Sequence, residues 1–473
     1  MTEIRKGSEI EVQVEKLAFG GSALGYLNGL VVFLDHGIPG QLVRARITRK
    51  KPQYVEASPV EVLRQSPHYR DPFCPHFSVC GGCRWQDIDY ETQLLWKRSH
   101  VADCLERISG IEDTRTAPVI ASPDQRFYRN KMEYTFSPRR WLSPLEIAAK
   151  DTVYDKSLAL GLHIRGFYDK VFNVESCFLQ SEASVELVRF VRKWCAESGI
   201  AAYSTRNHQG YWRFLVVREG KRTGESLAHL ITAGIPEYAP RVDQLGREIA
   251  SRFPWLTSFV HSVSSKKAQV AFGDSSRVLF GPGAITERLG NLRYSISAHS
   301  FFQTNPLAAE GLYETVLRFA ELTGKETVWD LYCGTGSISL FVAPRVRRVV
   351  GYEVIEEAIS DAYDNGRRNG IENCTFKAGD LKDTLGKDVE SLSPHEVPDV
   401  VITDPPRSGM HPKVLKTLLE LAPERIVAVS CNPATLARDL CLLAEQYEIR
   451  KVQPFDLFPH TPHIECVVQL ERR

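Results

Sequence analysis

Apolar and polar residues alternate with a two-residue period near the N-terminus of the chain. Residues 10–15 read Ile-Glu-Val-Gln-Val-Glu, which places the apolar side chains on one face of a β-strand. Two further short apolar runs, 30–34 and 42–48, are separated by the turn residues Pro39 and Gly40. Several short strands in such a segment predict a small closed barrel of the OB-like kind over residues 1–63.

The middle of the chain has a mixed pattern. Apolar residues recur near helical spacing at about 90–109, which predicts a helix that packs on the C-terminal domain. Strand-like runs such as 210–218 and 258–265 follow. We therefore expect a mixed α+β central domain over residues 64–295.

From residue 296 onward, strand patterns alternate with helical ones. The expected strands are 327–331, 348–353, 400–403, 425–430 and 463–470. This alternation is typical of an α/β fold with a doubly wound, Rossmann-like sheet whose two faces are covered by helices. The third domain is expected to span residues 296–473.

The length of the chain indicates several domains, and its composition excludes some classes of protein. A length of 473 residues exceeds what one core usually organises. Lys and Arg number 59 against 58 Asp and Glu, so the net charge of +1 excludes a basic coat but allows a local basic groove. We find no apolar run near the roughly 20 residues of a membrane span and no secretory core. Eleven cysteines without an export signal fit a cytoplasmic protein.

Two segments combine basic and aromatic residues. Residues 44–54 carry five positive charges ahead of Tyr54, and residues 126–140 hold several arginines among four aromatic residues. Such segments grip phosphates and stack on bases in nucleic-acid-binding proteins. A solvated turn or the charged face of a hairpin has the same composition, so neither segment alone decides between the two interpretations.

A glycine-rich turn follows the first strand of the expected Rossmann-like domain. Gly334 and Gly336 allow the backbone to approach a ligand. Glu353 ends the next strand about twenty residues later, where an acid accepts hydrogen bonds from ribose hydroxyls. The third glycine of a pyrophosphate-binding turn is absent. This favours S-adenosyl-L-methionine (SAM) over NAD as the ligand.

Two later strand ends carry candidate chemistry. Asp404 ends a strand and begins the sequence Asp-Pro-Pro-Arg. Cys431 lies where a strand stops and a helix is expected to begin, a position that lowers the pKa of a thiol and favours the reactive thiolate. The alternative is a small buried residue at the edge of the sheet.

The residues around Cys431 resemble those of a known family. Residues 430–439, with 404–407 upstream and 463–465 downstream, resemble the RNA uracil-C5 methyltransferases, and the resemblance spans nearly the whole chain. It implies that the barrel is a TRAM domain, that Cys431 is the nucleophile that adds to uracil C6, and that Glu465 is the base. Glu465 also lies in a strongly apolar strand, where burial raises the pKa of a carboxyl.

The same resemblance implies a set of SAM contacts. The residues concerned are Gln303, Tyr332, Ser337, Glu353, Asp380 and Asp404. Ser337 stands where many relatives have Asn, which puts that one contact in doubt. The target uracil has to leave its stack to reach Cys431, so we expect extrusion from a structured RNA.

A second cysteine group lies in a loop rich in Pro and Gly. Cys74, Cys80 and Cys83 have a spacing that suits a 4Fe–4S cluster as well as zinc. The family resemblance implies an iron–sulfur site here and a fourth ligand in the central domain, where Cys177 fits. His76 is a rival ligand. The cysteines left as packing residues are Cys104, Cys195, Cys333, Cys374, Cys441 and Cys466.

A barrel combined with a cysteine cluster resembles the branch of the family that acts on large-subunit (23S) ribosomal RNA. We therefore expect SAM-dependent formation of 5-methyluridine in 23S rRNA, without an obligate protein partner. Two alternatives remain: the same chemistry on transfer RNA, and an RNA-binding or folding factor that has lost catalysis. The joint presence of Cys431, Glu465, Asp404 and Gln303 opposes the last of these.

Overall fold

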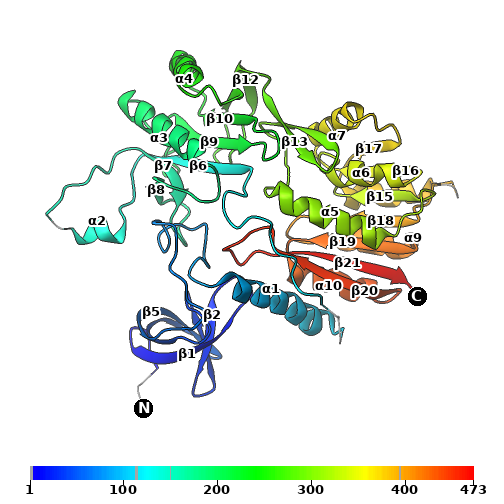
Figure 1. Ribbon diagram of the computed structural model, residues 1–473, viewed down its shortest axis with the longest axis horizontal. Coiled ribbons are helices and arrows are strands. Elements are labelled where there is room, and N and C mark those ends of the chain that lie inside the picture. Colours follow the sequence, from blue (N-terminus) through cyan, green and yellow to red (C-terminus); the bar gives the residue numbers. More distant parts are fainter. Residues whose placement is uncertain (1–3, 112–115, 150, 394–395) are drawn as a thin grey trace.

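The computed structural model describes residues 4–111, 116–149, 151–393 and 396–473 (Figure 1). Residues 1–3 of the expected barrel lie outside this description. The chain forms a small β-barrel, a central sheet and a larger C-terminal sheet flanked by helices (Figure 1). In the described residues, no helix is long and apolar enough to cross a membrane.

The N-terminal barrel is closed, as the alternating pattern predicts. Its five strands pair in the order β1-β2-β3-β5-β4. They are β1 (Glu9–Leu17), β2 (Ala23–Leu27), β3 (Leu30–Leu34), β4 (Leu42–Lys50) and β5 (Tyr54–Arg64). Val12, Val32 and Val43 are fully buried inside it, so the apolar face of each strand forms the core.

The basic residues of β4 are largely compensated by acids on neighbouring strands. Arg44 pairs with Glu61 at 2.5 Å and Arg46 pairs with Glu9 at 2.9 Å. Arg49 lies 3.6 Å from Glu56. Cross-strand ion pairs of this kind describe a solvated barrel surface better than a free phosphate-binding strand.

The central sheet has seven strands in the order β12-β11-β10-β9-β6-β7-β8. They are β6 (Lys131–Ser137), β7 (Ala159–His163), β8 (Val171–Asn173), β9 (Trp212–Glu219), β10 (Ser226–Thr232), β11 (Ser258–Val263) and β12 (Ser275–Phe280). Two short helices, α2 (Pro144–Ala148) and η2 (Pro236–Tyr238), lie in its connections.

One face of the central sheet is covered by helices, on the side away from the barrel (Figure 1). Helices α3 (Glu182–Glu197) and α4 (Ala239–Arg252) share a core with alternate strand residues such as Met132 and Leu215. The intervening residues, among them Lys131, point to the opposite face because side chains alternate along a strand. That second face is polar along β6, where it carries Lys131 and Glu133, and it holds a small buried apolar cluster of Phe214, Val216 and Ile231 on the neighbouring strands.

The C-terminal sheet is doubly wound, as predicted. Its order is β17-β16-β15-β18-β19-β21-β20, and β21 alone among these seven strands runs antiparallel to its neighbours β19 and β20. The strands are β15 (Thr327–Leu331), β16 (Arg348–Glu353), β17 (Cys374–Ala378), β18 (Val400–Thr403), β19 (Arg425–Ser430), β20 (Tyr447–Phe455) and β21 (Glu465–Arg472). The last strand begins two residues later than expected.

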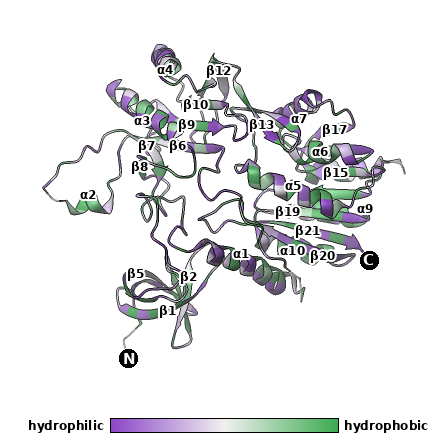
Figure 2. Ribbon diagram, in the orientation of Figure 1, coloured by the Kyte–Doolittle hydropathy of each residue, from purple (hydrophilic) through white to green (hydrophobic). Residues whose placement is uncertain are grey.

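Helices cover both faces of this sheet. Helices α5 (Pro306–Ala320), α6 (Ser337–Val342) with η3 (Ala343–Arg345), and α7 (Glu356–Arg368) pack on one face, whereas α8 (Leu381–Glu390), α9 (Pro412–Leu421) and α10 (Pro433–Leu443) pack on the other. Figure 2 shows that these helices carry both hydrophobic and hydrophilic residues. Each therefore buries one side against the sheet.

Two elements outside the expected third domain also belong to its core. Helix α1 (Tyr90–Cys104) and the turn η1 (Leu105–Ser109) pack on α10 through Val101 and Leu105. The hairpin of β13 (Ala284–Leu289) and β14 (Leu292–Ser297) contributes Ile285 and Ile296 to the core under α5. We therefore propose that the C-terminal domain begins ahead of β13 rather than at residue 296.

Helix α1 also holds the loop between β20 and β21. The Lys97 ammonium lies 2.6 Å from the Asp456 carboxylate, and both side chains are fully buried. The Tyr90 hydroxyl donates to the other Asp456 oxygen at 2.9 Å. Gln93 accepts from the backbone N–H of His460 at 2.9 Å. A buried ion pair needs such additional hydrogen bonds to offset desolvation, so residues 456–463 are fixed in place just before Glu465.

Candidate active site

Three strand ends bring the predicted chemical groups together. Asp404 directly follows β18 and Cys431 directly follows β19, so both lie at the carboxyl edge of the parallel sheet. Strand β21 pairs with β19 so that Ser430 faces Cys466. One further step in this antiparallel register places Cys431 beside Glu465, the first residue of β21.

The residues after Cys431 lock the turn that carries it. The Asn432 side chain caps α10 by accepting from the N–H of Ala434, and its amide donates to the Arg407 carbonyl at 3.0 Å. The Thr435 hydroxyl donates to the same carbonyl at 3.3 Å. These bonds tie the Asp-Pro-Pro-Arg segment to the turn that carries Cys431, so the two motifs form one structural unit.

A glycine completes this turn. Gly409 has a φ of +78°, and a Cβ there would lie 2.4 Å from the Arg438 guanidinium. A larger residue would be strained by the backbone and would displace the Arg438 side chain that pairs with Asp439. The close approach of these loops therefore depends on glycine at this position.

The charge state of Cys431 differs from the sequence-based expectation. Burial, with Glu465 and Asp404 nearby, raises the pKa of the Cys431 thiol to about 11, and the Arg407 guanidinium acts in the opposite direction. The position before a helix was expected to lower this pKa. Desolvation and two neighbouring carboxyls outweigh the helix terminus.

The two carboxyls are themselves held in an unusual state. Burial raises the pKa of Asp404 to about 6. Burial and the Asp404 charge raise the pKa of Glu465 well above its usual value, against the effect of Arg407. The neutral form of Glu465 is therefore favoured over what an exposed glutamate would show. The corner combines a thiol, a buried carboxyl and a cation.

The glycine-rich turn after β15 is shaped by left-handed backbone. Tyr332, Gly334 and Gly336 all have positive φ angles, of 68°, 54° and 76°. A Cβ on Gly336 would lie 3.0 Å from Ala362 and Phe376. The N–H of Gly334 donates to the Glu353 carboxylate at 3.1 Å, so the turn and the acid at the end of β16 form one corner.

The other predicted SAM residues lie around this corner, and some of them already have hydrogen-bond partners within the protein. Gln303 lies in the loop before α5, and its neighbour Phe301 accepts from Thr335 of the turn at 3.5 Å. Ser337 begins α6, and its hydroxyl is 2.9 Å from the Tyr313 hydroxyl. Asp380 follows β17, caps α8 and pairs with Lys382 at 2.6 Å. Ser337 and Asp380 thus have partners within the protein already.

The corner suits a ligand that has ribose hydroxyls and a positive charge. Burial, followed by the nearby Asp404 and Glu353 charges, raises the pKa of Asp330 to about 7. One Asp330 oxygen accepts from Ser339 at 2.5 Å, and the other is buried without a partner. A sulfonium cation would relieve the repulsion among these carboxyls, so the residues present fit SAM.

The cysteine loop is attached to the central domain next to Cys177. Cys80 bridges to Ile164 in the sheet. The His76 ring accepts from the backbone N–H groups of Glu175 at 3.1 Å and Ser176 at 3.4 Å. That engagement makes His76 a poor rival for the fourth ligand position.

The four predicted cysteines influence one another electrostatically. Burial, followed by the neighbouring cysteines Cys177 and Cys74, raises the pKa of Cys83 to about 12, and Cys80 reaches about 12 in the same way. In the described ranges, no three His, Cys, Asp or Glu side chains are grouped so that they could hold a single metal ion. The group is therefore a set of neighbouring thiols rather than a preformed single-ion site.

Two functional candidates were not identified from the sequence. Arg407 ends the Asp-Pro-Pro-Arg sequence, which by itself assigns it no role, and in the structure its charge lowers the pKa values of Cys431 and Glu465. Asp330 is an acid within the apolar strand β15, and its unusual position in the sequence is the signal that could have indicated a functional carboxyl. Among the cysteines left as packing residues, Cys441 is exposed and does not fill a core.

Comparisons with known proteins agree with this site. The model of the tRNA (Uracil-5-)-methyltransferase family matches residues 274–473, and that of the TRAM domain matches residues 4–60. An uncharacterized RNA methyltransferase of Nitratidesulfovibrio vulgaris is 40% identical over 100% of this chain and 98% of its own length. Another, from Bacteroides thetaiotaomicron, is 42% identical over 97% of this chain and 100% of its own.

A solved structure is similar over almost the whole fold. The tRNA (uracil-54, C5)-methyltransferase of Pyrococcus abyssi, in complex with S-adenosyl-L-homocysteine, matches with a TM-score of 0.74 and 28% identity over 98% of this chain and 100% of its own. The chain therefore belongs to the family of RNA uracil-5 methyltransferases, enzymes that transfer the methyl group of SAM to uracil C5 in RNA.

Proposed function

We propose that the enzyme forms 5-methyluridine through a covalent bond between the Cys431 sulfur and C6 of the target uracil. The observation that supports this most strongly is the register of β19 and β21, which sets Cys431 beside Glu465. A nucleophile and a buried carboxyl side by side are what the reaction needs at its first and last steps.

Each step has a residue suited to it. Uracil C5 is a poor nucleophile, and addition of the Cys431 thiolate to C6 makes C5 an enolate carbon. When bound, SAM would supply the methyl group from its sulfonium to C5, and S-adenosyl-L-homocysteine would leave as the S–CH3 bond breaks. Glu465 then removes the C5 proton, the C5–C6 double bond re-forms and the thiolate leaves. Proton transfer of this kind contributes about 10²–10⁴-fold to a rate.

The charges around Cys431 and Glu465 are compatible with these steps. The thiolate needs a nearby cation, and Arg407 is the group that lowers the pKa of Cys431. Glu465 has to be ionised when it acts as a base, and positive charge at the reacting centre favours that state. Its raised pKa makes it a stronger proton acceptor than an exposed glutamate.

We propose that the ligand corner holds SAM through Gln303, Tyr332, Glu353 and Asp404. Glu353 is the acid placed for the ribose hydroxyls. Ser337 and Asp380 are secondary contacts in this proposal, because each already has a protein partner.

The proposed substrate is a uridine in 23S ribosomal RNA. The TRAM barrel and the cysteine loop support this choice by their resemblance to that branch of the family. Transfer RNA is the second candidate, since the similar Pyrococcus abyssi protein is by its title a tRNA methyltransferase. We propose no obligate protein partner and a cytoplasmic location for the enzyme.

We further propose that Cys74, Cys80, Cys83 and Cys177 hold a 4Fe–4S cluster. In such a cluster each thiolate binds a different iron, so the sulfurs stay farther apart than the ligands of one ion. This agrees with neighbouring thiols that form no single-ion group in the described residues. The cluster would fasten the loop of residues 74–83 to the central domain.

Substitution of the proposed base should trap the covalent intermediate. In Glu465→Gln, methyl transfer to C5 proceeds but the proton stays, so turnover should fall by about 10²–10⁴-fold while a protein–RNA adduct accumulates. A slow-migrating band on a denaturing gel, formed with SAM and unmodified RNA, measures it. Glu471→Gln, on the same strand and partly exposed, is the control and should turn over normally.

The adduct should require the thiol. The double variant Cys431→Ala with Glu465→Gln should give no band. Absence of a band in Glu465→Gln itself, with RNA and SAM still bound, would contradict the role of Glu465.

The pH dependence of thiol alkylation should follow the charges around Cys431. Because its pKa is raised, the thiolate fraction and the alkylation rate should increase from neutral pH up to about 11. Arg407→Gln removes the cation and should slow alkylation several-fold at any pH below that point. Glu465→Gln removes a carboxyl that raises the pKa and should accelerate it.

Mass spectrometry of the Cys431 peptide measures these rates, and the exposed Cys441 in the same digest is the internal control. Identical pH profiles in the wild type and Arg407→Gln would show that this cation does not act on the nucleophile.

Anaerobic purification should give a brown protein with about four iron atoms per chain. Cys177→Ser should lose the colour and most of the iron, whereas Cys441→Ser should keep both because Cys441 is exposed and distant in sequence from the cluster loop. Iron analysis and the visible absorption spectrum provide the measurement. A colourless wild-type protein that contains zinc would rule out the cluster.

A further inference from the structure

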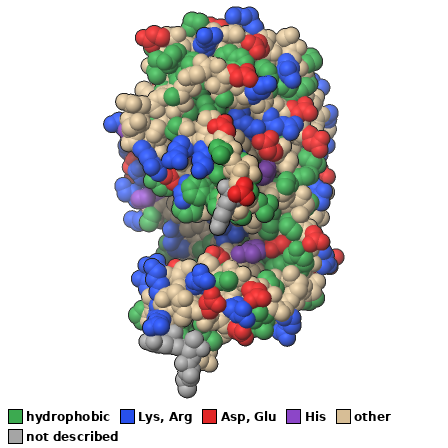
Figure 3. Space-filling view, turned by 90° about the vertical axis from the view of Figure 1, so that its left-hand side faces the viewer, with side chains coloured by type: hydrophobic (Ala, Val, Ile, Leu, Met, Phe, Trp, Pro, Cys, Tyr) green, Lys and Arg blue, Asp and Glu red, His purple; other side chains and the backbone are tan. Residues whose placement is uncertain are grey.

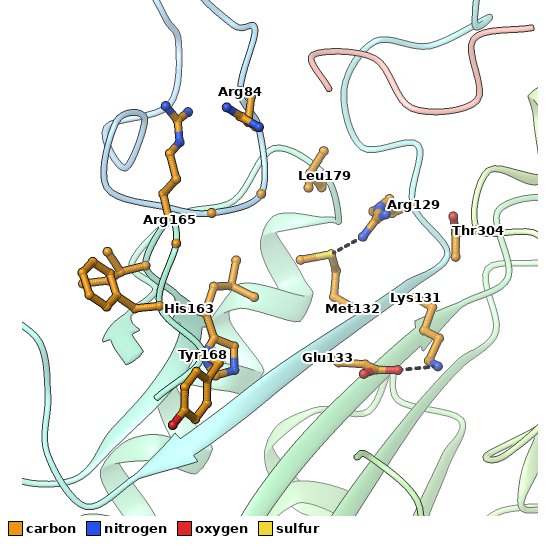
Figure 4. A pocket seen from close by; sticks show the side chains of 16 residues that line it. Arg84, Arg129, Lys131, Met132, Glu133, His163, Arg165, Tyr168, Leu179 and Thr304 are labelled. Atoms are coloured by element: carbon orange, nitrogen blue, oxygen red, sulfur yellow. Dashed lines mark hydrogen bonds and ion pairs between the residues drawn. The ribbon is translucent and has the colours of Figure 1, made fainter. Parts of the chain in front are cut away.

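A cavity of about 590 Å³ lies between the cysteine loop and the polar face of the central sheet. Four cationic side chains line it: Arg84, Arg129, Lys131 and Arg165. Figure 4 shows Arg84 and Arg165 on one side of this cavity and Arg129 and Lys131 beside β6 on another. Figure 3 shows the molecule hollowed above the barrel, with Lys and Arg side chains along the hollow.

The charges in this cavity are only partly compensated by the protein. Lys131 pairs with Glu133 at 2.6 Å. No ion pair within the four described ranges joins Arg84, Arg129 or Arg165 to a carboxylate. Burial lowers the pKa of Arg84, and the nearby Arg165 lowers it further, against the effect of Asp35. Grouped cations that are partly removed from water are costly when unpaired, and a bound anion would stabilise them.

Several donors in the cavity are also left without acceptors. Nε and Nη2 of Arg165 and Nε of Arg129 are buried and make no hydrogen bond. Nδ1 of His163 and the hydroxyl of Thr304, both in the lining, are in the same state. Arg84 is oriented by bonds from Nη1 to the Gly20 carbonyl at 2.7 Å and from Nη2 to the Asp35 carbonyl at 3.2 Å. Unused guanidinium donors match the oxygens of a phosphate.

The cavity borders the active site. The Arg129 guanidinium lies 5.8 Å from the ring centre of Phe458, and the backbone N–H of Arg84 donates to the His460 carbonyl at 2.8 Å. Both contacts reach the loop that leads to Glu465. On the other side, the Asn130 amide donates to the Gln303 carbonyl at 3.0 Å. Whatever fills the cavity is therefore held beside the base and the predicted SAM loop.

We infer that this cavity binds a backbone phosphate of the substrate RNA next to the target uridine. The inference rests on RNA being the substrate of the active site. Extrusion of a base requires the strand to be gripped beside it, and phosphate contacts set that register. Tyr168, which lines the cavity and is 79% exposed, offers a face on which a neighbouring base stacks. Arg129 and Lys131 thereby give a role to the basic segment of residues 126–140.

Binding of a labelled oligouridylate to the purified protein, measured over a series of salt concentrations, tests the inference. Arg165→Gln and Arg129→Gln should each weaken binding several-fold. Each should also reduce the slope of log K against log salt by about 0.7, the value for one phosphate on a single strand. Arg165→Lys keeps the charge and should restore most of the slope. Arg247→Gln, exposed on α4 at the far face of the sheet, is the matched control and should match the wild type.

Steady-state methyl transfer to unmodified RNA separates binding from chemistry. Arg165→Gln should raise KM for RNA and leave kcat within about twofold, since only binding of the strand is altered. Unchanged slope and KM in both variants would overturn the inference. So would loss of inorganic phosphate binding in Arg165→Gln with binding of oligouridylate unchanged, because the cavity would then be a site for free phosphate. If the wild type transfers no methyl group, the proposed function fails, and the salt slopes still decide the RNA contact.

Discussion

The antiparallel pairing of β21 with β19 determines where the reactive groups of this enzyme lie. Strand β19 delivers Cys431 at its carboxyl end, and the register with β21 sets Glu465 next to it. That register depends on the preceding loop, which Lys97 and Asp456 fasten to helix α1 by a fully buried ion pair. The helix, from the segment between barrel and central sheet, thus helps to position Glu465, the proposed base, more than 350 residues later in the chain.

Removal of water from this corner explains its acid–base character. Burial raises the pKa values of Cys431, Asp404 and Glu465 together. Burial therefore favours the neutral forms of the thiol and the carboxyls in this corner. Nearby positive charge favours the thiolate and the carboxylate, and Arg407 supplies part of it. Ionisation of the proposed nucleophile only after the substrates bind would limit unproductive reactions.

Much of the architecture could be predicted from the sequence because it depends on local periodicity. The barrel and the strands from β15 to β19 follow directly from apolar patterns, and Cys431 from its place at a strand end. Features that depend on partners distant in sequence could not be predicted. The acids that neutralise Arg44 lie on other strands, and the carboxyls that raise the pKa of Cys431 come from β18 and β21. The hairpin β13–β14 packs in the core of the C-terminal sheet rather than in that of the central sheet, and this too depends on partners that are distant in sequence.

We propose that this corner methylates uracil in ribosomal RNA. Transfer of labelled methyl groups from SAM to RNA is the direct test of this proposal. Purified enzyme is incubated with methyl-labelled SAM and unmodified total RNA, which is then separated by size and digested to nucleosides. We expect label in the large ribosomal RNA, recovered as 5-methyluridine. The Cys431→Ala variant should transfer no label. Label confined to transfer RNA would contradict the proposed substrate, and label in neither RNA would contradict the proposed reaction.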